Sequence, residues 1–351
     1  MKVVILGPVI NNASSGGVAV FDEGLYRGFT ENGNEVFMIS NQPSTSIETI
    51  VISKKPLKPS HIIFKKEKIA RIIKKIKPDL VIASLHYAMG IKQYKRKWNK
   101  ATYVQVLHGF PCPINGRFKA SLINHLIRKS YKHFDKVVAV SSLTYALNKK
   151  INRIVCTNII PNGCDISTET STSNKRDYDF VYVGRLFKDK EVKMIAESFI
   201  KAKRINPLLK FAIAGYGEME KLFLEGEFKC EEIDYYGKLS QNEVSSLLSK
   251  SKFLVSMNSL EPFGIVFAEA IINGCNIITQ STSGFAGFAI KEKYYHICDS
   301  INSEDLANNF CKFATEFEPI NKKEIDRLRG LLSFSSVAME YEKLAAKKED
   351  D

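Results

Sequence analysis

Short apolar runs alternate along this chain with longer segments in which apolar residues recur every three or four positions. In the first example, the β-branched run from Val3 to Leu6 ends at Gly7, and the pair Gly16 and Gly17 precedes an apolar-periodic segment at 18–29. This order predicts a strand, a glycine loop and a helix. The same plan predicts strands at 35–39, 80–84, 102–107 and 136–140, and helices at 65–76 and 117–132.

A polar stretch rich in Ser and Thr, STETSTSN at 167–174, interrupts this plan and indicates a linker at 167–178. The plan then resumes, with strands predicted at 180–183, 211–214, 253–256 and 276–279 and helices at 191–204, 218–224, 241–250 and 265–273. Alternating strands and helices favour parallel sheets covered on both faces. We therefore expect an α/β protein with Rossmann-like domains at 1–166 and 179–332. Ligands bind beyond the carboxyl ends of parallel strands, which would place a substrate in the cleft between them.

The overall composition agrees with two folded domains. At 351 residues, the chain exceeds the roughly 250 to 300 residues at which one core stops growing. No apolar run reaches the ~18 residues that span a bilayer, and the apolar start is too short for a signal peptide, so we expect a cytoplasmic protein. The seven cysteines are odd in number and never form a C-x-x-C pair, which indicates neither a disulfide framework nor a zinc site.

The segment from Glu261 to Glu269, EPFGIVFAE, carries the clearest candidate chemistry. Pro262 and Gly264 predict a tight turn after a strand, and the helix that follows has unpaired N–H groups and a dipole that attract phosphate. Glu261 and Glu269 bracket this site, and a carboxylate can accept hydrogen bonds from two neighbouring sugar hydroxyls. A surface glutamate beside a helix cap would fit the same spacing, so the pair needs support from elsewhere in the chain.

Arg185 and Lys190 supply that support. Both follow the predicted strand at 180–183 and precede a predicted helix. Two cations at this place could neutralise a diphosphate whose negative charge rises as its bond to a sugar breaks, which is a form of preorganised electrostatic stabilisation.

The chain resembles the retaining glycosyltransferases of family 4, the glycosyl transferases group 1, which have the GT-B fold. The resemblance rests on an ordered set of short motifs that spans nearly the whole chain. In order, these are Gly16-Gly17, His108-Gly109, Val140-Ser141, Pro161 to Asp165, Val183 to Leu186 with Lys190, Ala214 to Gly217, Gly237 to Leu239, and Glu261 to Glu269 with Ala270 and Gly274. It implies two facing Rossmann-like domains with a donor site in the interdomain cleft, and a C-terminal helix at 333–351 that often crosses back to the first domain.

The resemblance also implies roles for individual residues. Arg185 and Lys190 would bind the donor diphosphate, near Gly16, Gly17 and the backbone of Phe263, Gly264 and Ile265. Glu261 would hold donor-sugar hydroxyls and Glu269 the ribose, while the backbone at Lys238 and Leu239 would meet the base. His108 would lie beside the transferred sugar, contacting it or ordering the backbone there, although a His after a buried strand is more often structural.

Family members retain the anomeric configuration by front-face substitution, in which the leaving diphosphate helps to remove the acceptor proton, so we assign no catalytic base. They need no metal or other cofactor, because Arg and Lys replace the cation. Two positions depart from the family pattern. Glu191 stands where the family commonly has glycine, and 281–288 lacks the usual glycine pair and glutamate.

The positive charge is concentrated in the first half. Residues 1–150 hold 25 Lys and Arg against 8 Asp and Glu, whereas the net charge of the whole chain is +13. Basic runs with apolar positions occur at 62–77, 91–100 and 117–136, and the second contains the only tryptophan. Such segments suit an anionic membrane surface. The candidate residues for membrane or acceptor binding are Lys65, Lys66, Arg71, Lys95, Arg96, Lys97 and Trp98. The apolar face of 62–77 would equally serve to pack a helix on the sheet.

We therefore expect a retaining hexosyltransferase that moves a hexose or N-acetylhexosamine from a nucleotide-diphosphate sugar to a glycan acceptor. The basic half favours a lipid-linked acceptor, in surface polysaccharide or glycolipid synthesis, and peripheral attachment to the inner face of the cell membrane. A soluble-acceptor transferase and a GT-B nucleotide-sugar epimerase remain alternatives. A nucleic-acid-binding protein would also suit the basic half, but no helix-turn-helix, zinc-finger or RNA-recognition signature is present.

Overall fold

A computed structural model describes residues 1–11, 16–55, 59–109, 125, 128–165, 176–228, 232–258, 260–280, 283–287, 292–298 and 302–345. The chain divides into two compact units. The first comprises Met1–Asp165 and Leu331–Asp351, and the second comprises Ile166–Gly330. Most of the predicted linker at 167–178 and most of the predicted helix at 117–132 lie outside the described residues, as do residues 281, 282 and 288 of the divergent loop at 281–288.

The first unit is built on a parallel sheet with the strand order β3-β2-β1-β4-β5-β6-β7. Its described strands are β1 Lys2–Leu6, β2 Glu35–Ser40, β3 Thr49–Val51, β4 Leu80–Ser84, β5 Thr102–Leu107, β6 Lys136–Ala139 and β7 Asn158–Ile159. The strand order reverses between β1 and β4, which pair directly, with Val3 opposite Leu80. In open parallel sheets, ligands bind at such a reversal, beyond the carboxyl ends of the strands.

Helices cover both faces of this sheet. They are α1 Gly17–Glu31, α2 Lys66–Ile76, α3 Ile91–Lys97, α5 Ser142–Leu147 and α12 Phe334–Ala345. Ile69 and Ile73 of α2 and Tyr94 of α3 join one buried core with Val4 and Leu6 of β1. Because side chains alternate along a strand, Val3 and Ile5 point to the opposite face, and both are fully buried.

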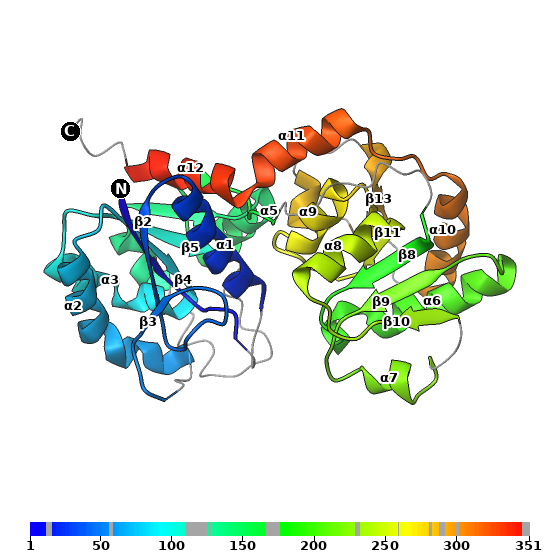
Figure 1. The fold of residues 1–351 in the computed structure, drawn as a ribbon, viewed down its shortest axis with the longest axis horizontal. Coiled ribbons are helices and arrows are strands. Elements are labelled where there is room, and N and C mark those ends of the chain that lie inside the picture. The colour runs from blue at the N-terminus through cyan, green and yellow to red at the C-terminus, as the bar shows by residue number, and fades with distance from the viewer. Residues whose placement is uncertain are drawn as a thin grey trace. The chain divides into compact units, whose positions relative to one another are not determined.

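The C-terminal helix α12 packs along α1 within the first unit (Figure 1). A Cβ atom at Gly28 would overlap the backbone of Phe334, so only glycine allows this close approach. Beyond the end of α1, Asn34 Nδ2 donates to Glu342 Oε1 at 2.7 Å. The last helix of the chain is thus an integral layer of the N-terminal unit.

The second unit repeats the architecture with the strand order β10-β9-β8-β11-β12-β13. Its described strands are β8 Tyr178–Val183, β9 Phe211–Ala214, β10 Ile233–Tyr235, β11 Ser251–Ser256, β12 Asn276–Thr279 and β13 Tyr295–Ile297. Its helices are α6 Val192–Ile205, α7 Lys221–Leu224, α8 Gln241–Ser249, α9 Ile265–Ile272, α10 Ser303–Thr315 and α11 Lys322–Leu332, the last of which continues past Gly330 into the first unit. Here the order reverses between β8 and β11.

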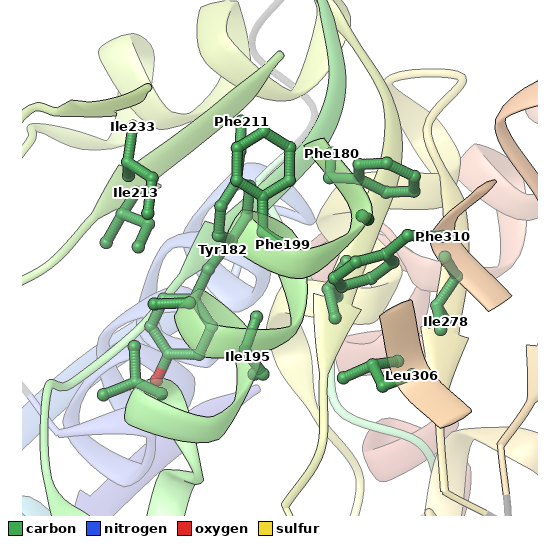
Figure 2. Close-up of a cluster of buried hydrophobic side chains, with 14 of the residues drawn as sticks. Phe180, Tyr182, Ile195, Phe199, Phe211, Ile213, Ile233, Ile278, Leu306 and Phe310 are labelled. Carbon is green, nitrogen blue, oxygen red and sulfur yellow. The ribbon is translucent and has the colours of Figure 1, made fainter. Parts of the chain in front are cut away.

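An aromatic cluster forms much of the core of the second unit (Figure 2). Phe180 of β8 stacks on Phe253 of β11 with ring centroids 5.8 Å apart and meets Phe310 of α10 at 4.4 Å. Phe199 of α6 packs on Phe211 of β9 at 5.0 Å. These contacts hold α6 and α10 side by side on one face of the sheet and fix the strands whose carboxyl ends carry the candidate site.

Candidate functional site

Arg185 lies in the loop directly after β8, and close backbone contacts with the loop after β9 fix its position. The N–H of Gly184 donates to the carbonyl of Ala214 at 3.0 Å, and the N–H of Leu186 donates to Tyr216 at 2.9 Å. A Cβ atom at Gly215 would overlap the carbonyl oxygen of Gly184, so these loops could not meet in this way with a larger residue. The backbone of Arg185 is therefore held, while its exposed guanidinium remains available to a ligand.

Lys190 and Glu261 form an ion pair at the point where the strand order reverses. Lys190 Nζ lies 3.3 Å from Glu261 Oε2, and Asn258 Nδ2 donates to the same oxygen at 2.9 Å. The lysine follows β8 and the glutamate follows β11, which are neighbouring strands. The two side chains remain 21% and 23% exposed, so an incoming anion can reach the ammonium and a hydroxyl can reach the carboxylate.

Glu191, which departs from the family pattern, has a left-handed backbone conformation. Its φ is 54° and its ψ is 22°, at the N-cap of α6. A residue with a Cβ atom pays about 1–2 kcal/mol in this conformation, whereas glycine does not. This geometry explains why glycine suits the position, and it places an extra negative charge next to Lys190.

The start of α9 is shaped by Gly264, which also has a left-handed conformation with a φ of 79°. A Cβ atom there would lie 2.6 Å from Phe267 Cδ2 and 3.1 Å from Glu261 Cγ. The ring of Phe263 is buried against Phe285, with centroids 5.4 Å apart. Phe263, which the sequence placed among the donor contacts, therefore offers a ligand its backbone and not its ring. No acidic residue lies in the first turn of α9, which leaves its positive dipole end without an internal counter-charge.

Glu269 lies inside α9 and is only 8% exposed. Its Oε1 accepts a hydrogen bond of 2.6 Å from Nε2 of Gln241, the first residue of α8. Neither Gln241 nor Asn258 was predicted from the sequence as a partner of a candidate carboxylate. Single amides carry no periodic signal. Only the fold brings Gln241 to Glu269, which lies 28 positions away, whereas Asn258 lies three positions before Glu261.

Lys238 and Leu239 follow β10, at the sheet edge. Lys238 Nζ lies 5.2 Å from the centroid of the Tyr216 ring, so the loops after β9 and β10 also meet. Leu239 lines a cavity of about 640 Å³ together with Tyr178 and Tyr236. None of the other predicted donor residues lines this cavity among the described residues.

His108 belongs to the first unit, where it ends a short polar chain. Ser84 Oγ lies 3.0 Å from His108 Nε2 and donates to Asp22 Oδ1 at 2.7 Å. The imidazole also packs edge-on against Phe21, with centroids 4.8 Å apart. Burial lowers the pKa of His108 to about 3, which leaves the ring neutral near pH 7. Such a ring can accept or donate a hydrogen bond, but a proton carrier would need a pKa near neutrality.

Asp22 is fully buried. Burial raises its pKa well above the usual range, the neighbouring Glu23 raises it further, and the Ser84 hydrogen bond opposes both effects. Neither Asp22 nor Ser84 was predicted from the sequence. Gly16 and Gly17, which were predicted from it, are exposed at the start of α1, where Gly16 is the extended N-cap.

The structure assigns packing roles to part of the predicted basic surface. Lys95 pairs with Asp135 at 2.8 Å, and Glu67 lies 3.4 Å from Lys97 and 3.9 Å from Arg96. The indole N–H of Trp98 donates to the carbonyl of Pro78 at 2.8 Å, and its ring packs against the core. Trp98 is therefore half-buried, with its indole nitrogen bound to the backbone and its ring packed against the core.

The apolar face of the basic segment at 62–77 likewise faces the interior, where Ile62, Ile69 and Ile73 are buried. Lys66 and Arg71 are exposed and Lys65 is half-buried. Half of the third basic run, at 117–136, lies outside the described residues. Within the described part of the chain, no helix has both the length and the apolar character needed to cross a membrane. No cluster of three or more His, Cys, Asp or Glu residues suited to a metal ion occurs there either.

Comparison with known proteins agrees with this architecture. A model of glycosyltransferase family 4 matches residues 15–168, and a model of the glycosyl transferases group 1 matches residues 165–319. The glycosyltransferase YqgM of Bacillus subtilis is 27% identical over 49% of this chain and 48% of its own length. The GtfA subunit of a Streptococcus pneumoniae UDP-N-acetylglucosamine–peptide N-acetylglucosaminyltransferase is 25% identical over 45% of this chain. The match spans only 33% of that relative, so in both cases the chain aligns with less than half of the curated protein.

Solved structures resemble the chain over nearly its whole length. A sucrose-phosphate synthase from Thermosynechococcus elongatus superimposes with a TM-score of 0.79 and 16% identity, covering 99% of this chain and 98% of the synthase. HepE of Anabaena, in complex with UDP and glucose, has a TM-score of 0.75 and 13% identity, with 99% and 100% of the two chains covered. At these identities the likeness establishes the fold. With its two parallel-sheet units and the two matching family models, the chain belongs to the glycosyltransferases of the family 4 and group 1 type, with the GT-B fold.

Proposed function

We propose that this glycosyltransferase transfers a hexose or N-acetylhexosamine from a nucleotide-diphosphate sugar to a glycan acceptor. The observation that carries the proposal is the Lys190–Glu261 pair. It places a cation that can bind a diphosphate beside a carboxylate that can accept hydrogen bonds from sugar hydroxyls, at the point where the strand order reverses. Two similar proteins were solved with UDP: HepE with glucose, and the pneumococcal GtfA with N-acetylglucosamine. UDP is therefore the first nucleotide to test here.

In this proposal, Arg185 and Lys190 bind the two phosphates, and the start of α9 at Gly264 and Ile265 adds backbone donors. A bound diphosphate draws Lys190 away from Glu261, whose carboxylate then accepts hydrogen bonds from the sugar. Donor binding thus converts an internal ion pair into two contacts with the substrate.

The nucleoside end of the donor would occupy the neighbouring loops. Glu269, oriented by Gln241, binds the ribose hydroxyls. The backbone at Lys238 and Leu239 meets the base, beside the Tyr216 ring. Each of these groups follows a strand of the same sheet, which supports a single extended nucleotide site.

We propose a metal-independent reaction with retention of configuration. Two cationic side chains and a helix start can balance the charge of the departing diphosphate, which is the task that a metal performs in other transferases. His108 is neutral near pH 7, so its proposed role is to contact or order the transferred sugar. The diphosphate itself would take the acceptor proton as it leaves.

The proposed acceptor is a lipid-linked glycan, reached at the inner face of the cell membrane in surface polysaccharide or glycolipid synthesis. The excess of Lys and Arg over Asp and Glu in the first half of the chain supports this choice. A soluble acceptor and an epimerase reaction are the competing possibilities. An epimerase would release a free sugar with no acceptor present, and a soluble-acceptor enzyme would work without membranes.

A calorimetric screen of nucleoside diphosphates and their sugars tests the proposal. We expect UDP or another nucleoside diphosphate to bind more tightly than the monophosphate, because the second phosphate engages Lys190. Failure of every nucleotide to bind would refute the donor site.

A further inference from the structure

A second cavity, of about 530 Å³, opens in the first unit between the start of α2, the start of α3 and the segment before β6. Its cationic lining comprises Lys66, Lys92, Lys129, Lys132 and His133, which we call the lysine groove. These residues come from three separate segments, so the fold and not a run of sequence brings them together. No Asp or Glu is among the described residues that line it.

The lysines of this groove have no internal counter-ions among the described residues. Glu67, which adjoins Lys66 in sequence, pairs instead with Lys97 and lies 3.9 Å from Arg96. Asp135, just beyond His133, pairs with Lys95 at 2.8 Å. The nearby carboxylates are thus engaged by cations outside the groove, and its positive charge remains free for an external anion.

The pKa of His133 reflects the positive electrostatic potential in the groove. This pKa is lowered by partial burial, and then by the charges of Lys92, Lys95 and Lys132. Cations held this close repel one another, and an anion placed among them removes that repulsion.

The remaining lining gives the groove an apolar side. Ile63, Met89 and Ile91 contribute to it. The residue next to Ile63, Phe64, is 79% exposed, which is unusual for a phenylalanine. Cations beside apolar side chains match a ligand that joins a phosphate to a hydrocarbon region.

We propose that the lysine groove binds the headgroup phosphate of an anionic lipid and holds the first unit on a membrane surface. The inference deepens the proposed membrane-associated acceptor, but it does not depend on the donor residues of the second unit. Free phosphate would satisfy the cations but not the apolar side. A single-stranded nucleic acid would require stacking partners, and His133 is the only ring among the described residues of the lining.

The test uses the full chain and vesicles of 30% phosphatidylglycerol in phosphatidylcholine, compared with pure phosphatidylcholine. The groove variant is Lys92→Gln with Lys132→Gln. Its matched control is Lys74→Gln with Lys75→Gln, which removes the same charge from two exposed lysines at the end of α2. We expect the groove variant to bind anionic vesicles about 30-fold more weakly and the control no more than about threefold more weakly. Wild-type protein should ignore neutral vesicles.

Equal losses of vesicle affinity in the two variants would indicate diffuse attraction between the basic unit and the membrane, and would overturn the proposed binding site. Equal binding of the wild-type protein to neutral and anionic vesicles would overturn it as well. Groove-dependent binding of inorganic phosphate in the absence of vesicles, together with no groove-dependent binding to anionic vesicles, would identify free phosphate as the ligand and overturn the lipid assignment. Groove-dependent binding to duplex RNA in place of vesicles would also overturn the lipid assignment. Binding of UDP to each variant shows that the protein is folded, and it separates failure of this inference from failure of the proposed donor site.

Discussion

Lys190 Nζ and Glu261 Oε2 lie 3.3 Å apart, although 70 residues separate them along the chain. The parallel sheet creates this pair, because β8 and β11 are neighbours and both loops leave the same edge. A donor diphosphate must compete with Glu261 for Lys190. The pair therefore links the diphosphate and the sugar of the proposed donor, and its disruption should affect the protein's interactions with these two parts in opposite ways.

Glu261→Gln should strengthen the binding of UDP and weaken sugar transfer. Without the carboxylate, Lys190 is free for the diphosphate, and a partly exposed ion pair of this kind is worth up to about 1 kcal/mol, or roughly fivefold in affinity. The donor sugar loses a charged acceptor, so turnover should fall by at least tenfold. Calorimetry with UDP and an assay of UDP release measure the two effects. Weaker binding of UDP to the variant would contradict this account.

Glu269→Ala should act through the ribose. We expect UDP to bind about tenfold more weakly, because a carboxylate that bridges two hydroxyls is lost. The affinity for 2′-deoxy-UDP should change much less, since that ligand lacks one of those hydroxyls. Glu243→Ala is the matched control, because Glu243 lies on α8 and serves its capping box. An equal loss of affinity for UDP and for its deoxy analogue in the Glu269 variant would show that Glu269 does not bind the ribose.

Glu191→Gln should strengthen the binding of UDP about fourfold. The substitution keeps the left-handed backbone and removes one negative charge next to Lys190. Two phosphate charges roughly 10 Å away would then lose a repulsion of about 0.8 kcal/mol at the dielectric of water. Glu197→Gln, two turns further along α6, should have a smaller effect. Identical effects of the two substitutions, measured by calorimetry at one ionic strength, would locate the diphosphate elsewhere.

The two titratable groups that flank Ser84 should give the protein opposite pH signatures. Asp22 has a raised pKa in the folded state. The stability that it contributes to the fold is therefore fully present below pH 3.8 and is lost as the pH rises towards the pKa of Asp22 in the folded state. The stability gained by Asp22→Asn relative to wild type should therefore increase with pH above about 4, by at most about 1.4 kcal/mol per pH unit. Urea unfolding at several pH values measures the slope.

His108→Gln provides the control of opposite sign. The pKa of His108 falls from 6.5 to about 3, so protonation of the unfolded chain removes wild-type stability as the pH drops below 6.5. The gain from His108→Gln should thus increase towards low pH. Parallel slopes for the two variants would show that these groups do not titrate as their burial requires.

Much of the fold could be predicted because the central strands are β-branched apolar runs with glycine at their ends, as at Val3 to Leu6. The edge strands β3, β7, β10 and β13 have only two or three residues, which is too short for an alternating pattern to emerge. The predicted helix at 218–224 shortens to Lys221–Leu224 for a similar reason, because one helical turn carries little periodic information.

The candidate site was predictable where a residue type carries its own signal. Gly264 is one example, since its left-handed backbone explains the glycine in the motif. Gln241, Ser84 and Asp22 act through hydrogen bonds to distant residues, and only the folded chain brings those partners together. Trp98 has contacts that the sequence did not indicate, because its indole N–H donates to the carbonyl of Pro78 and its ring packs against the core.

The most direct test of the central claim is calorimetric titration of UDP into Lys190→Ala and into Lys188→Ala. Both lysines belong to the same short helical turn, but Lys188 is exposed and has no ion pair among the described residues. Loss of a charge-assisted contact with the diphosphate predicts that Lys190→Ala binds UDP about 10- to 100-fold more weakly, with Lys188→Ala close to wild type. Unchanged affinity in Lys190→Ala, or an equal loss in both variants, would contradict the proposed donor site.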